Sequence, residues 1–175
     1  MPFKIKSIIF AVIIFIFVPL AAIAIWNESF YFDKVPMLAP VGYNGPMPVR
    51  NDFRGDGDFG TKRRGNRSHQ GIDILAKIGT PVRAAKGGIA YACLQKKGMG
   101  KYVRIQHRGG IVTIYGHLSK ICIKQVQRVR QGQVIGEVGD TGNAQYRGIM
   151  PHVHFEIRIH GVATDPKKYL SQWNT

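Results

Sequence analysis

The sequence has few cysteines. Cys93 and Cys122 are the only two in 175 residues, and their spacing forms no C-x-x-C pair. This excludes a zinc ribbon, which needs several closely spaced cysteines. A single disulfide and two separate thiols both remain compatible with the sequence, because pairing requires Cα atoms within roughly 7 Å.

Acidic residues are also scarce. The chain has 10 Asp and Glu against 25 Lys and Arg, which gives a formal net charge of +15. Such a protein attracts polyanions, and its binding to them weakens as salt is raised. Nucleic acid, anionic lipid and an anionic cell-wall polymer all fit this charge. The charge by itself selects none of them.

Charged residues are absent from 7 to 26, where the chain is almost entirely apolar. This run is long enough to span a bilayer. It also resembles a secretory signal, because Pro19 interrupts it and Ala22-Ile23-Ala24 offers a cleavage site. Both alternatives export the rest of the chain, and Lys4 and Lys6 fit that orientation by the positive-inside rule. We favour an uncleaved anchor in the inner membrane with the domain on the periplasmic side, because the apolar run continues beyond the cleavage site.

The exported part is expected to be a linker followed by one domain. Residues 27–50 contain prolines and glycines without sustained periodicity, which is typical of a short tether. Residues 51–175 have a length that suits a single domain with its own core. We find no internal repeat or low-complexity block.

Helical stripes with caps at both ends are hard to find after residue 68. Short alternating or apolar runs separated by glycines predict an all-β, β-dominated domain. Arg108-Gly109-Gly110 has the signature of a hairpin turn. Residues 119–129 are ambiguous and have room for a short helix. The expected strands are 72–76, 80–85, 89–94, 102–107, 111–116, 133–138 and 153–159.

Two histidines on one expected strand give the first chemical signal. From Pro151 to Ile159, apolar residues alternate with His152, His154, Glu156 and Arg158. Strand side chains have a period of two, so the two imidazoles project from one face, roughly 6.5–7 Å apart, while the apolar set faces a core. Two neutral nitrogen donors on a rigid strand suit a metal-centred hydrolytic site.

A second pair, His69 and Asp73, lies far upstream. Side chains four positions apart share one face of a strand or a helical turn, and Gly71 between them would leave room for a ligand or metal. With one of the strand histidines they offer two imidazoles and a carboxylate, the composition of a catalytic zinc site that keeps its fourth position for water. His117 follows Gly116 at a probable strand end and is either a base or a partly buried core histidine.

Seven short blocks occur in one order between Arg67 and Arg158. They are Ser68-His-Gln-Gly-Ile-Asp73, Gly79-Thr-Pro-Val82 with Ala84 to Gly87, Gly100-Lys-Tyr-Val-Arg-Ile-Gln-His107, Thr113-Ile-Tyr-Gly-His-Leu118, Val129-Arg-Gln-Gly-Gln-Val-Ile-Gly136, Gly139-Asp-Thr-Gly142 and Pro151-His-Val-His-Phe-Glu156. In these blocks the chain resembles the lysostaphin-type zinc metallopeptidases, the LytM family of cell-wall endopeptidases.

The resemblance implies antiparallel sheets that form an open groove. It implies one Zn²⁺ per chain on His69, Asp73 and His154, with His117 and His152 as catalytic histidines beside a metal-activated water. All of these residues are present, which favours an active enzyme over relatives that have lost ligands. The stretch 143–150 looks longer than the glycine-rich connection usual in the family. A difference in loop shape and substrate preference is therefore expected.

The expected function is hydrolysis of peptide cross-links of bacterial peptidoglycan in the cell envelope. The bond from D-alanyl to meso-diaminopimelate is our first choice, and glycine bridges are the second. The alternative is a non-hydrolytic wall-binding activator of another murein hydrolase. A nucleic-acid binder is disfavoured by export and by the absence of a basic motif interleaved with aromatics. The basic clusters at 62–67, 96–101 and 120–130 are either substrate contacts or solvated faces.

Overall fold

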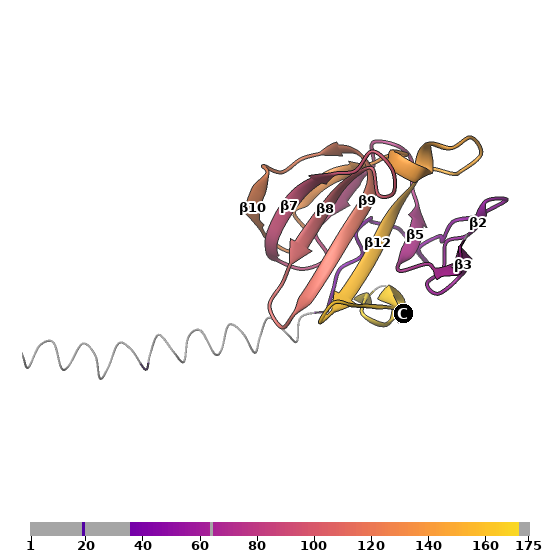
Figure 1. Ribbon diagram of the computed structural model, residues 1–175. Coiled ribbons are helices and arrows are strands. Elements are labelled where there is room, and N and C mark those ends of the chain that lie inside the picture. The colour runs from indigo at the N-terminus through magenta and orange to yellow at the C-terminus, as the bar shows by residue number, and fades with distance from the viewer. Residues whose placement is uncertain (1–18, 20–35, 64, 172–175) are drawn as a thin grey trace, which may run out of the picture. The chain divides into compact units, whose positions relative to one another are not determined.

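The domain is built on a nine-stranded antiparallel sheet (Figure 1). The computed structural model describes residues 19, 36–63 and 65–171. Between residues 36 and 171, the only helical elements described are two 3-10 helices, η2 (Gly142–Gln145) and η3 (Pro166–Lys168). The expected all-β fold class is confirmed.

The strands of the large sheet are β5 (Ile72–Leu75), β6 (Pro81–Arg83), β7 (Gly88–Leu94), β8 (Lys101–Gln106), β9 (Ile111–Ile121), β10 (Val126–Val129), β11 (Val134–Val138), β12 (His152–Ile159) and β13 (Val162–Thr164). Two short hairpins precede it. They are β1 (Asn51–Asp52) with β2 (Gly55–Asp56), and β3 (Lys62–Arg63) with β4 (Arg67–Ser68).

The long strand β9 organises the sheet because it changes partners along its length. On one edge it pairs with β8. On the other edge, Ile111–Gly116 pairs with β12 and Leu118–Ile121 pairs with β11. Strand β12 pairs on its other side with β5, so it lies between β9 and β5 in Figure 1. His117 is the residue at which β9 passes from one partner to the next.

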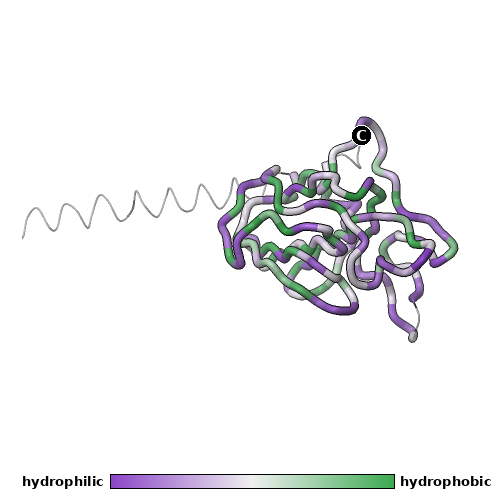
Figure 2. The backbone as a smooth tube through the Cα atoms, turned by 90° about the horizontal axis from the view of Figure 1, so that it is seen from above, coloured by the Kyte–Doolittle hydropathy of each residue, from purple (hydrophilic) through white to green (hydrophobic). Residues whose placement is uncertain are grey.

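The core lies beneath β12 and its neighbours. Along β12, Val153, Phe155 and Ile157 are fully buried, and Phe155 packs on Tyr115 with ring centroids 5.2 Å apart. Hydrophobic and hydrophilic segments follow one another along the tube in Figure 2. The apolar side chains of β12 therefore anchor the strand, and the opposite set of side chains is available for a site.

The expected strands are present with shifts of one or two residues at their ends, except that the strand expected at 111–116 extends to Ile121. The turn at Gly109 and Gly110 joins β8 and β9 as predicted, and both glycines have positive φ values, 68° and 69°. The short helix allowed at 119–129 is wrong. β9 continues to Ile121, and β10 then pairs with β7, because that edge of β7 requires hydrogen-bond partners. Cys93 and Cys122 are separate thiols.

The described part of the expected linker packs on the sheet instead of forming a free tether. Met37, Ala39 and Val41 are buried in the core, and Val49 bridges Ile74 of β5. The sequence does not reveal this packing, because the interspersed prolines and glycines leave no sustained periodicity there. Between residues 36 and 50 the structure describes isolated bridges at Met37 and Val49 and no strand, and the carbonyl oxygen of Pro40 accepts from the N–H of Arg83 at 2.8 Å.

The apolar segment 7–26 lies outside the described residues, apart from Pro19. Among the helices that the structure describes, none combines the length and apolar character required to cross a bilayer.

Gly71 serves close packing of the chain against β12, and does not leave the room for a metal that its position suggested. A Cβ at this position would lie 2.9 Å from the carbonyl carbon of Phe155 and 2.9 Å from Cγ of Glu156. The main chain would have to shift to admit a methyl group, because a backbone carbonyl cannot rotate away as a flexible side chain can.

We expect Gly71→Ala to lower the free energy of unfolding by about 1–3 kcal/mol through this overpacking. Gly42→Ala is the matched control, because a Cβ at Gly42 meets nothing within 4 Å and should change stability by less than about 0.5 kcal/mol. Urea unfolding of the metal-free chain measures both. Equal stability of the two variants would contradict the packing role.

Candidate metal centre

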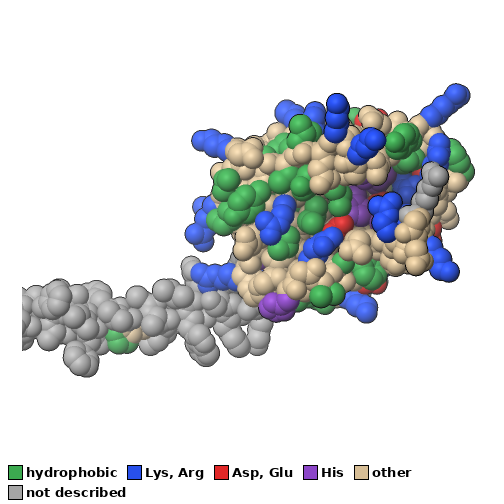
Figure 3. Space-filling view, in the orientation of Figure 1, with side chains coloured by type: hydrophobic (Ala, Val, Ile, Leu, Met, Phe, Trp, Pro, Cys, Tyr) green, Lys and Arg blue, Asp and Glu red, His purple; other side chains and the backbone are tan. Residues whose placement is uncertain are grey.

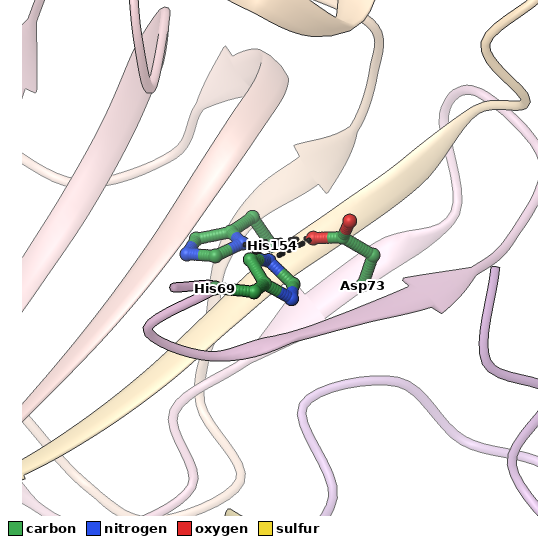
Figure 4. A group of neighbouring side chains, drawn as sticks. All are labelled: His69, Asp73 and His154. Atoms are coloured by element: carbon green, nitrogen blue, oxygen red, sulfur yellow. Dashed lines mark hydrogen bonds and ion pairs between the residues drawn. The ribbon is translucent and has the colours of Figure 1, made fainter. Parts of the chain in front are cut away.

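Strand pairing brings His154 and Asp73 together. The register of β12 against β5 sets these two residues opposite each other, and His69 reaches the same point from the connection between β4 and β5. His154 Nδ1 lies 2.8 Å from Asp73 Oδ1, His69 Nε2 lies 3.1 Å from the same oxygen, and the two ring nitrogens are 3.0 Å apart. Figure 4 shows the three side chains converging.

In His69 and His154, the ring nitrogen that points away from Asp73 Oδ1 forms a hydrogen bond. His69 Nδ1 lies 2.9 Å from the carbonyl oxygen of Asp58, and His154 Nε2 lies 3.0 Å from Oε1 of Glu156. Both partners are acceptors, so these nitrogens carry the protons that are donated to them. When the rings are neutral, the opposite nitrogens have lone pairs on the side of Asp73 Oδ1, whereas a second proton on His154 is donated to that oxygen.

Two imidazole lone pairs and a carboxylate oxygen around one point form a donor set that suits a divalent ion. One ligand atom of each residue lies within 4.8 Å of the others, and all three residues are buried. A tetrahedral zinc ion with bonds of about 2.0–2.1 Å keeps its ligand atoms about 3.3 Å apart, within a few tenths of an ångström of the separations here. The residues fit zinc.

The charges in this cluster are strongly perturbed. Burial favours the neutral acid of Asp73, but hydrogen bonds from His154 and His69 outweigh it and hold the pKa of the carboxyl well below its usual range. Burial lowers the pKa of His154, but the hydrogen bonds to Asp73 and Glu156 outweigh it and raise that pKa to about 9. Without a metal, a proton on His154 therefore neutralises part of the repulsion between converging lone pairs.

Two further histidines face the same cluster. His117 lies in β9 at the point where this strand changes its pairing from β12 to β11, and His152 lies in β12. The centroids of the two rings are 4.9 Å apart. His117 Nδ1 donates to the carbonyl oxygen of Thr141 at 2.8 Å, and His152 Nδ1 donates to that of Met150 at 2.7 Å. Each Nε2 is thereby left as a proton acceptor.

The backbone at His117 is unusual for a residue with a side chain. Its φ is 61°, in the left-handed region, and its N–H bonds to the carbonyl oxygen of Met99 at 2.7 Å. Strain of this kind concentrates at functional positions, where the surrounding structure holds it. Burial lowers the pKa of His117 to about 3 and also lowers the pKa of His152, so both rings are neutral at pH 7.

The structure thus brings together all five residues singled out in the sequence. The sequence interpretation gave no role to Glu156 and Arg50. Glu156 orients His154, and Arg158 holds Glu156 with Nε and Nη2 each 2.8 Å from Oε2. Glu156 was detectable, because the strand period puts it on the same face as His154. Arg50 donates hydrogen bonds to Asp73 although it is 23 positions away in the sequence, and no local sequence pattern predicts this contact.

The cluster lies on the wall of an open cleft of about 950 Å³. Figure 3 shows histidine side chains in a hollow, with basic side chains around it. Arg54, Arg63 and Arg67 line this cleft together with Tyr146 from the loop after η2. The basic residues expected at 62–67 therefore include cleft-lining groups, and the cleft attracts anionic ligands.

Comparisons with known proteins identify similar sequences and folds. The sequence model of Peptidase family M23 matches residues 67–166. A DD-carboxypeptidase/endopeptidase, Mpg of Neisseria meningitidis, is 46% identical over 101 residues, which cover 57% of this chain and 22% of that protein. The peptidoglycan DD-endopeptidase ShyC of Vibrio cholerae is 37% identical over 101 residues, covering 58% and 22%. This chain thus spans about a fifth of those relatives.

Among solved structures, lysostaphin, an antimicrobial peptidase from Staphylococcus simulans, superimposes with a TM-score of 0.55 at 33% identity, covering 65% of this chain and 47% of that one.

Uptake of zinc should release a proton at pH 7. The raised pKa of His154, about 9, means that the metal-free ring is protonated there, and coordination requires its Nδ1 lone pair. Apparent zinc affinity should therefore rise with pH up to about 9, roughly tenfold per unit, and then level off. Calorimetric titration in two buffers of different ionisation enthalpy counts the protons. Zinc binding without proton release at pH 7 would contradict this.

Proposed function

Because this chain belongs to peptidase family M23, we propose that it is a zinc-dependent endopeptidase that hydrolyses peptide cross-links of bacterial peptidoglycan. The resemblance to the lysostaphin-type peptidases is confirmed. The observation that carries the proposal is the meeting of His69, Asp73 and His154 at one point, with His117 and His152 beside it.

In this proposal His69, Asp73 and His154 hold the zinc ion. When bound, zinc supplies Lewis-acid polarisation of the scissile carbonyl and activation of water for attack. The protein holds the ligands in register on β5 and β12, two paired strands of a rigid sheet, and Glu156 fixes the tautomer of His154.

His117 and His152 handle the protons. Both rings are neutral at rest and carry a lone pair on Nε2, so either nitrogen can accept a proton from the attacking water. Once protonated, the same Nε2 becomes a donor for the developing oxyanion or the leaving amine. The backbone carbonyls of Thr141 and Met150 keep both rings oriented during this exchange.

The substrate class follows from the relatives and the charge of the cleft. The name DD-endopeptidase given to ShyC fits a bond between two D-centres, such as D-alanyl to meso-diaminopimelate. Arginines along the cleft suit a peptide mesh rich in carboxylates. We therefore keep this bond as the first choice and glycine bridges as the second. Residues 7–26 are proposed to anchor the enzyme in the inner membrane, with the domain in the periplasm.

Substitutions in the site should separate zinc binding from catalysis. Asp73→Ala and His154→Ala should lose zinc and activity, because each removes a ligand. His117→Ala should keep zinc but lower turnover by about 10²–10⁴-fold, because it removes a proton acceptor. Metal analysis and release of soluble fragments from purified wall measure the two effects.

The exposed His160 does not line the cleft, so His160→Ala is the matched control and should retain both zinc and turnover. Full wall hydrolysis by either ligand variant would refute the ligand assignment.

Mass spectrometry of fragments released from purified peptidoglycan identifies the bond. We expect cross-linked dimers to be split at D-alanyl to meso-diaminopimelate, and a chelator should abolish this while added zinc restores it. Zinc binding without any released fragment would favour the non-hydrolytic wall-binding activator instead.

A further inference from the structure

The segment just before the family-matched region reaches into the site. Arg50 precedes β1, lies outside residues 67–166 and is only 5% exposed. Its Nε and Nη2 donate to Oδ2 of Asp73 at 3.2 and 3.1 Å. Its backbone N–H also donates to the carbonyl oxygen of Asp73 at 2.8 Å. Arg50 thus holds both the main chain and the carboxylate of one ligand candidate.

These contacts determine which carboxylate oxygen faces the other ligands. Both guanidinium hydrogen bonds go to Oδ2, and Oδ1 is the oxygen near His69 and His154. A two-point contact from a planar guanidinium resists rotation of the carboxylate more than a single ammonium contact does. Arg63 also approaches Oδ2, but at 3.6 Å and with a side chain that is 24% exposed, so its hold is weaker.

Asp52 links Arg50 to the backbone next to His152, one of the two candidate catalytic histidines. Its Oδ1 accepts from Nη1 of Arg50 at 2.7 Å, and its Oδ2 accepts from the backbone N–H of Met150 at 3.2 Å. The carbonyl oxygen of Met150 is the acceptor for His152 Nδ1. A continuous series of hydrogen bonds therefore runs from Asp73 through Arg50, Asp52 and Met150 to His152.

The same series fixes the end of the long loop 143–150. Met150 is its last residue, and Asp52 bonds to it from the β1–β2 hairpin. The ring of Phe53, in that hairpin, packs over Gly148 of the loop. The loop that is expected to differ from the family pattern is thus held by the segment that precedes the family-matched region.

We propose that Arg50 and Asp52 are positioning residues of this enzyme. Arg50 fixes the carboxylate of Asp73 for metal binding, and Asp52 holds the backbone N–H of Met150, the residue whose carbonyl oxygen orients His152. This inference rests on the proposed function, because it assigns roles toward the same zinc ion and the same hydrolysis.

The test uses variants of the full chain and reads out metal binding as well as activity. Arg50→Gln should weaken zinc binding by roughly 10–100-fold in chelator competition, because the carboxylate of Asp73 loses its two-point partner. It should also change the visible absorption spectrum of the Co²⁺-substituted protein, which reports the coordination of the metal. Arg50→Lys, which keeps the charge but not the fork, should fall between Arg50→Gln and the wild type.

Asp52→Asn should act on turnover. It leaves an oxygen for Arg50 but removes one acceptor, so Met150 and His152 are less firmly held. We expect zinc affinity within about threefold of the wild type and kcat lowered roughly tenfold at unchanged KM.

Arg83→Gln is the matched control, because Arg83 donates to the carbonyl oxygen of Gly132 and does not line the cleft. Its zinc affinity, Co²⁺ spectrum and kcat should equal those of the wild type. Thermal unfolding identifies the folded variants, and Arg50→Lys and Asp52→Asn keep the test valid if Arg50→Gln does not fold.

Wild-type zinc affinity and an unchanged Co²⁺ spectrum in both Arg50 variants would refute the role of Arg50. Wild-type kcat in Asp52→Asn would refute that of Asp52. In either case a zinc-binding, wall-cleaving wild type would leave the proposed function intact. A wild-type chain that binds no zinc and releases no fragments would overturn the proposed function itself.

Discussion

The site depends on the pairing register of β12 with its two neighbours. His154 lies opposite Asp73 on one side and opposite Gly116 on the other. A slip of one residue would turn His152 and His154 into the core and expose Val153 and Phe155. The burial of that apolar face therefore fixes the register. The same interaction that stabilises the sheet sets the geometry of the proposed ligands. A change of register at the site would therefore also disrupt the core.

A second constraint is the direction of the hydrogen bonds around the cluster. The outer nitrogens of His69, His154, His117 and His152 all face acceptors, so the inner nitrogens have lone pairs whenever the rings are neutral. Such a concentration of acceptors is unfavourable in a buried place unless a cation or proton fills it. The proposed metal binding and the stability of this region are therefore linked, since a cation or proton at the centre removes the repulsion between these acceptors.

Much of the fold and site was predictable because the signals were local. The period of two gave β12, its apolar face and the common side of His152 and His154, and it also contained Glu156. Other features depend on distant partners. Residues 119–129 look ambiguous in isolation. They continue β9 to Ile121 and then form β10, because an edge of β7 needs hydrogen bonds. The packing of residues 36–50 is hidden by prolines, and Gly71 is explained only by its closeness to Phe155.

Arg50 illustrates the physical reason for what sequence patterns miss. A ligand must belong to a rigid element, so its spacing carries the period of that element and can be recognised. A residue that orients a ligand needs only to reach it, and any segment that packs alongside β5 can supply one. In this chain, Arg50 belongs to the segment that pairs with β5 at Val49 and continues into Asp52. Because that stretch also holds Met150, it joins the two strands bearing the site through contacts that neither strand's sequence encodes. With the proposed roles of Arg50 and Asp52, the functional unit begins before residue 67, where the family likeness starts.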